Sequence, residues 1–207
     1  MRAPAAPRLT NAIALSTAAA WAIAALSGHA QLVELQGGFI PLRARLGGPF
    51  VVPFALTPLT ATLVHGGLMH LAFNLLLFVF CGRQVESVIG HFRFLLLYVV
   101  GAYAAAAAQY FVNPLAPIPM VGASGAISAV LALYALLFSR KEVRAVGPLS
   151  SHWVRALWLA AAWLGLQALI AIAQRPEGAM IATAAHAGGF VAGLLLARPL
   201  IWRSLSG

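Results

Sequence analysis

Residues 94–139 read FLLLYVVGAYAAAAAQYFVNPLAPIPMVGASGAISAVLALYALLFS, without a single Lys, Arg, Asp or Glu. About 20 apolar residues span a bilayer as one helix, so this stretch is long enough for two crossings. Three prolines and an asparagine lie within residues 113–119, and prolines this closely spaced cannot continue a helix. We therefore expect two transmembrane helices here, at about residues 94–112 and 122–138.

The composition of the whole chain favours the same class of protein. Of the 207 residues, 62% are hydrophobic and only 8% are charged, and the mean hydropathy is +0.91. Soluble domains carry about 25% charged residues. So few charges cannot cover a water-facing surface, which excludes a soluble globular domain.

Charged residues divide the rest of the chain into further apolar stretches. Residues 9–33, 156–174 and 178–197 are each long enough for one crossing. Residues 46–82 begin with glycines and prolines and end in an apolar run, so one helix is expected there. The prediction is an all-α membrane bundle forming a single domain over residues 1–207, with six spans at about 11–30, 66–82, 94–112, 122–138, 155–173 and 180–198.

The basic residues predict the orientation of this bundle. The net charge is +9, but no continuous basic face forms, so nucleic-acid binding is not expected. With a cytoplasmic N-terminus, only Arg43, Arg45 and Arg175 of the 13 basic residues fall outside, as the positive-inside rule requires. We expect both termini in the cytoplasm, in a bacterial inner membrane. The long segment 31–65, between the first two spans, is too apolar for water and too broken to cross, so it should lie in the outer interface.

Polar side chains inside a span are costly and point to function, and four of those in the expected spans lie near the outer face. His70 and Asn74 lie early in the second span, Ser124 early in the fourth and His186 early in the sixth. These three helices all run inward from the outer face. At 1.5 Å per residue, the four side chains reach about 3–12 Å below their helix starts. We expect them to form one site that opens to the outer side.

Small residues surround the serine and the sixth-span histidine. Gly189 and Gly193 follow His186 at i+3 and i+7, so they share its helical face and allow close backbone approach. The fourth span has small residues at the same four-residue spacing: Ser124 and Ser128, and Gly125 and Ala129. Two such faces can meet, which would bring the Ser124 hydroxyl within hydrogen-bond reach of the His186 ring.

Supporting roles are expected for His70, Asn74 and His65. His70 and Asn74 are four residues apart and share a helical face, where both suit stabilisation of a tetrahedral intermediate. A hydrogen bond that holds the second span in place is the alternative for this pair. For His65, at the junction of loop and helix, we favour a structural role.

The acidic residues limit the chemistry. The chain has no aspartate, and its four glutamates lie in expected loops. A Ser-His-Asp triad is therefore excluded, and serine chemistry must use a dyad. No His-Glu-x-x-His motif and no acidic residue within a span is present, so neither a metal site nor a cofactor is expected.

Three motifs together resemble the rhomboid family of intramembrane serine proteases: HGGLMHLAFN at 65–74, GASGAI at 122–127 and AHAGGFVAG at 185–193. The resemblance covers about residues 11–200 and implies the family's minimal six-helix fold. It implies Ser124 as the nucleophile and His186 as the general base and acid.

The same resemblance implies the other site residues. The implied oxyanion hole consists of His70, Asn74 and the backbone N–H of Ser124, with Gly122 shaping the turn. Structural support is expected from His65, Gly125, Ser128, Gly189, Gly193 and Glu86. In many members an aromatic ring packs against the catalytic imidazole from the position of Ser128. Two arrangements are open here: Ser128 hydrogen-bonds His186, or another ring fills the space.

The expected function is hydrolysis of peptide bonds in or next to the transmembrane helices of membrane-protein substrates, through a Ser124–His186 dyad. One alternative is a catalytically inactive rhomboid-like scaffold that binds transmembrane clients. A small transporter is the other, but the sequence shows neither the inverted repeat nor the ion-pairing acid within a span that a transporter would predict.

Overall fold

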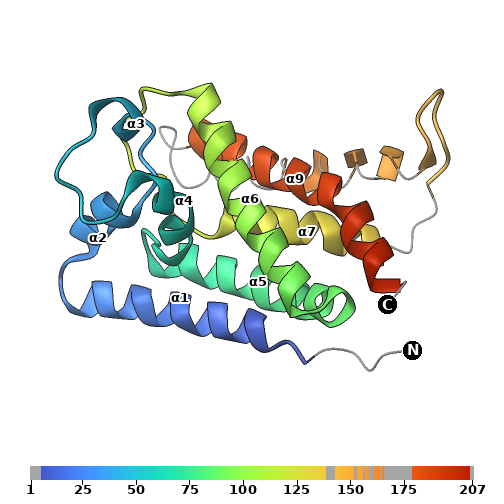
Figure 1. Ribbon diagram of the computed structural model, residues 1–207, viewed down its shortest axis with the longest axis horizontal. Coiled ribbons are helices and arrows are strands. Elements are labelled where there is room, and N and C mark those ends of the chain that lie inside the picture. Colours follow the sequence, from blue (N-terminus) through green and yellow to red (C-terminus); the bar gives the residue numbers. More distant parts are fainter. Residues whose placement is uncertain are drawn as a thin grey trace.

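The computed structural model describes residues 6–138, 143–151, 153–155, 157–158, 161–163, 165 and 179–205 (Figure 1). These residues are helical apart from turns and two isolated β-bridges. The long helices are α1 (Arg8–Leu26), α5 (Leu68–Ile89), α6 (His91–Val112), α7 (Ser124–Phe138) and α9 (Ala179–Leu205). The prediction of an all-α bundle is confirmed.

Among the described residues, four helical segments are long and apolar enough to cross a membrane: α1, α5, α6 and Thr183–Ile201 of α9. Helix α7 is apolar, and its described part has 15 residues. The expected span at 155–173 falls largely outside the described residues. The count of six spans is therefore a prediction that stays open.

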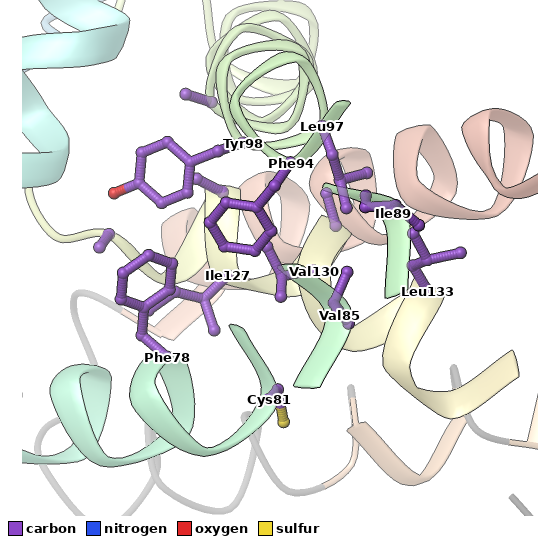
Figure 2. Close-up of a cluster of buried hydrophobic side chains, with 14 of the residues drawn as sticks. Phe78, Cys81, Val85, Ile89, Phe94, Leu97, Tyr98, Ile127, Val130 and Leu133 are labelled. Carbon is purple, nitrogen blue, oxygen red and sulfur yellow. The ribbon is translucent and has the colours of Figure 1, made fainter. Parts of the chain in front are cut away.

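Helix α7 lies at the centre of the bundle, where it packs against α5, α6 and α9 (Figure 1). Most of its residues are buried. Figure 2 shows the apolar core that holds it, in which Phe78 of α5 packs on Tyr98 of α6 at a ring-centroid distance of 5.3 Å, while Ile127 and Val130 of α7 fill the space beside them. This packing fixes the direction of the helix that begins with Ser124.

Helix α5 continues beyond its predicted end at residue 82. Arg83 is the first charged residue after the apolar run, yet the helix ends only at Ile89, before Gly90 with φ +80°. Polar residues end the membrane-buried part of a helix, but they do not end its backbone hydrogen bonding. The extension places Glu86 on an ordered helix rather than in a loop.

Glu86 ties the end of α5 to the beginning of α1. Its fully buried carboxylate accepts hydrogen bonds from the backbone N–H groups of Leu9 (2.9 Å) and Thr10 (2.7 Å). The Thr10 hydroxyl donates a further bond, and the His91 ring lies beside the same carboxylate. Free N–H groups at a helix start attract negative charge, so this contact stabilises the N-terminus of α1.

The segment between α1 and α5 folds into short helices: α2 (Ala30–Gly37), α3 (Arg43–Leu46), η1 (Phe54–Leu56), α4 (Thr57–Thr60) and η2 (Ala61–Leu63). Figure 1 shows them gathered at the end of the bundle where α5 and α7 begin. Arg43 organises the segment, because its guanidinium donates to the Val52 carbonyl at 2.7 Å and lies 3.6 Å from the centre of the Phe50 ring. A β-bridge between Phe39 and Met120 joins the segment to the chain just before α7.

Candidate active site

Ser124 and His186 meet where α7 begins beside α9. The Ser124 Oγ lies 2.7 Å from the His186 Nε2, a hydrogen-bond distance, and His186 is 6% exposed. Ser124 is the first residue of α7, so its backbone N–H lies among the free donors of a helix start. The pair thus combines a hydroxyl, an acceptor nitrogen and unpaired N–H groups at one point.

Glycines on α9 allow this approach. A Cβ at Gly189 would overlap the backbone carbonyl of Gly125, and one at Gly193 would overlap that of Ala129. On the neighbouring face, a Cβ at Gly188 would lie 2.6 Å from the Ala104 carbonyl of α6. The obstacle at Gly189 and Gly193 is backbone, which cannot move aside as a side chain can. The small-residue spacing seen in the sequence therefore corresponds to direct contact between helices.

The tautomer of His186 follows from its contacts. If the Ser124 hydroxyl donates to Nε2, the neutral ring carries its proton on Nδ1. The Nδ1 atom is buried and has no hydrogen-bond partner in the described part of the chain. Within the described part of the chain, no group takes the place that an aspartate has at Nδ1 in a triad.

His70 lies against the turn that precedes Ser124. Gly122 has φ +110°, which glycine tolerates and other residues rarely adopt. A Cβ there would lie 2.7 Å from both Cε1 and Nε2 of His70, and 3.8 Å from the Ser124 Oγ. The Gly122 N–H donates to the Ala61 carbonyl at 2.9 Å, which anchors the turn. The His70 imidazole and the serine hydroxyl are thus on the same side of one tight turn.

Asn74 follows His70 by one turn of α5 and is 6% exposed. Its Nδ2 donates to the His70 carbonyl at 2.8 Å, and its Oδ1 has no partner among the described residues. An amide nitrogen has two protons, so one donor remains after this bond. The bond to His70 stays within α5, so it is not the bond between helices that the sequence left open as the alternative role of Asn74.

His65 packs beside His70, just outside α5. The two rings are edge to face, with centroids 5.0 Å apart. Burial and the neighbouring His70 lower the pKa of the His65 imidazole to about 4. The His65 ring is therefore neutral near pH 7 and adds no charge beside the site.

Ser128 does not bond to His186. It is fully buried, its hydroxyl donates to the Ser124 carbonyl at 2.8 Å, and it accepts a 2.9 Å bond from the Trp163 indole Nε1. The Trp163 ring lies beside the imidazole, with centroids 6.3 Å apart and planes at 60°. Of the two arrangements left open by the sequence, the structure has the second, in which another ring takes the place beside His186.

Trp163 is the one residue of this cluster that the sequence analysis missed. It lies in the apolar stretch 156–174, where nothing distinguishes it from a membrane-facing tryptophan. A signal did exist, because a buried indole N–H needs an acceptor and Ser128 is an unusual polar residue within an apolar span. Within the described ranges, no group of three or more His, Cys, Asp or Glu side chains is placed to hold a metal ion.

Comparison with known proteins identifies the family. The family model described as the Rhomboid domain matches residues 55–203, well over half of the chain and all three sequence motifs. Over 92 residues the chain is 39% identical to the rhomboid protease GluP of Bacillus subtilis (strain 168), a match that covers 43% of this chain and 18% of that protein. The chain therefore spans only a small part of this relative's length. On the extent of the family match, the chain belongs to the rhomboid family.

Proposed function

We propose that this rhomboid protein is a serine endopeptidase that cleaves peptide bonds in or next to the transmembrane helices of membrane proteins. The observation that carries the proposal is the 2.7 Å distance between the Ser124 Oγ and the His186 Nε2, within a bundle of apolar helices. Membership of the family and the likeness to a named protease support it. Neither a cofactor nor a metal enters this chemistry.

The proposed reaction proceeds through an acyl-enzyme. His186 Nε2 takes the Ser124 hydroxyl proton while Oγ attacks the substrate carbonyl carbon. The tetrahedral intermediate collapses, the C–N bond breaks and His186 gives its proton to the leaving amine. Water, activated by the same nitrogen, then hydrolyses the ester and restores the serine hydroxyl.

Three groups are the proposed donors to the oxyanion. The His70 Nε2 lies beside the Gly122 turn, Asn74 has one N–H left, and the Ser124 backbone N–H begins α7. Donors fixed in place before the reaction stabilise developing charge without reorganisation. We assign these three groups to the oxyanion hole.

If Asn74 is an oxyanion donor, Asn74→Ala lowers kcat by about 10–1000-fold, as for other donors of this kind. The fold should change little, because the bond that is lost joins Asn74 to His70 on the same helix. The measurement is cleavage of a tagged transmembrane substrate in liposomes, with a thermal melt of each variant. Loss of the folded state with unchanged turnover per folded molecule would assign Asn74 a structural role instead.

The substrate is proposed to be a transmembrane helix that unwinds at the cleavage point, because a helical carbonyl is hydrogen-bonded and shielded. Glycine or other weak helix formers near that point lower the cost of unwinding. The distribution of basic residues supports cytoplasmic termini and a site that opens to the outer side. The proposed location is a bacterial inner membrane.

A fluorophosphonate probe, which forms a covalent bond with activated serines, tests the proposal. Purified wild-type protein should be labelled and Ser124→Ala should not. Ser87→Ala is the matched control, since among the described residues the Ser87 hydroxyl donates to the Gln84 carbonyl of its own helix, and it should label as wild type does. Folded wild-type protein that is not labelled would contradict the proposal and favour an inactive scaffold.

A further inference from the structure

We propose that Trp163 is the positioning residue of the catalytic histidine and that it also fixes the backbone of the nucleophile through Ser128. This inference rests on the proposed function and extends it. Trp163 is buried, at 6% exposure, and comes from a part of the chain between α7 and α9. It belongs to none of the three sequence motifs.

The first observation concerns what holds the imidazole. One nitrogen of His186 is engaged by the Ser124 hydroxyl, while its buried Nδ1 has no partner among the described residues. Among the described residues, no hydrogen bond at Nδ1 defines the plane of the ring, so packing is what these residues offer. The aromatic ring that they place beside His186 is that of Trp163, at 6.3 Å between centroids.

The second observation is that the indole is itself fixed. Its N–H donates to the Ser128 Oγ at 2.9 Å, and its ring packs in a buried cluster with Ala132 of α7 and Phe190 of α9. Phe190 follows His186 by four residues, so it lies on the same face of α9. Trp163 is therefore held from both helices that carry the dyad.

The third observation links Trp163 to the nucleophile. A hydroxyl has one proton, and that of Ser128 is donated to the Ser124 carbonyl at 2.8 Å. The Ser128 oxygen is then the acceptor for the indole N–H. The chain of bonds runs from Trp163 through Ser128 to the Ser124 backbone, so one side chain contacts the imidazole and restrains the residue that bears the hydroxyl.

This arrangement compensates for the absence of aspartate from the sequence. A displacement of about 1 Å in a reacting group can lower a rate about a hundredfold. Because substrate does not have to touch Trp163, its loss should affect the chemical step rather than binding. Part of the loss in kcat should come from removing the ring beside His186. The other part should come from removing the N–H that bonds to Ser128.

The test compares four variants with wild type in liposomes: Trp163→Leu, Trp163→Phe, Ser128→Ala and the double variant Trp163→Phe/Ser128→Ala. The matched control is Trp158→Leu, in the same stretch, because Trp158 is 65% exposed. Active sites are counted by stoichiometric fluorophosphonate labelling, and kcat is expressed per labelled site. This normalisation removes the effect of any misfolded fraction.

We expect Trp163→Leu to lower kcat per site about 10–100-fold with KM nearly unchanged, and Trp163→Phe to lower it less. The double variant should match the more damaged of its two single variants, because both break the same hydrogen bond. Trp158→Leu should match wild type. If Trp163→Leu does not fold, Trp163→Phe and the double variant test the positioning role of Trp163.

A kcat per site within about twofold of wild type in the folded Trp163 variants would overturn the inference, since a merely structural residue changes the number of sites and not their rate. Additive losses in the double variant would overturn the link through Ser128. Wild-type protein that neither labels nor cleaves would instead contradict the proposed function itself, and this result is seen before any variant is compared.

Discussion

Ser124→Ala, His186→Ala and the double variant are each expected to lose peptide-bond hydrolysis to one common residual rate, at least about a thousandfold below wild type. The reason is that the two groups act as a unit across 2.7 Å. A serine without its base is a weak nucleophile, and a base without its serine has no proton to accept. Removing the second partner after the first therefore costs nothing more.

The measurement is cleavage of a tagged transmembrane substrate by equal amounts of folded protein in liposomes. His29→Ala is a suitable control for the histidine, because His29 is exposed at the start of α2. Losses that add in the double variant would show that the two residues act independently and would contradict the dyad. A fully active His186→Ala would assign base catalysis to another group.

Gly189→Val is expected to destroy the folded bundle. Even the first atom of the new side chain would overlap the Gly125 carbonyl, so α9 must move away from α7. Overpacking of a rigid core typically costs about 1–3 kcal/mol, and here the obstacle is backbone, so we expect a loss at or above that range. Ser124 and His186 would separate as the helices part.

Thermal melts in detergent, with fluorophosphonate labelling of the same samples, measure this effect. Gly165→Val is the matched control, since a Cβ at Gly165 meets no atom of the described residues within 4 Å. The control should melt near wild type and keep its labelling. A Gly189→Val protein with wild-type melting temperature and labelling would mean that α7 and α9 do not touch as described.

The helices were predictable where apolar length and helix breakers decide the structure. The prolines and Asn113 within residues 113–119 separate α6 from α7 in the structure. Both ends of α6 and the start of α7 lie within three residues of their predicted bounds. Charged residues predict the end of a helix less well where the helix continues beyond its apolar part. Helix α5 continues through Arg83 because backbone hydrogen bonds do not require apolar side chains.

Site residues within the sequence motifs could be predicted from their spacing. Site residues that depend on contacts between distant segments could not. Nothing in the sequence pairs Trp163 with Ser128, because that bond joins residues 35 positions apart. The sequence also did not predict the short helices of segment 31–65. They depend on particular contacts such as those of Arg43, which neither periodicity nor composition encodes.

The place at which α7 begins has a consequence for how hydrolysis is possible at all. Ser124 is its first residue, so the nucleophile stands at a helix end rather than in the middle of a helix. Backbone N–H groups at a helix end lack partners within the helix and need water or another acceptor. We expect the water that the second half of the reaction consumes to arrive from this end of α7.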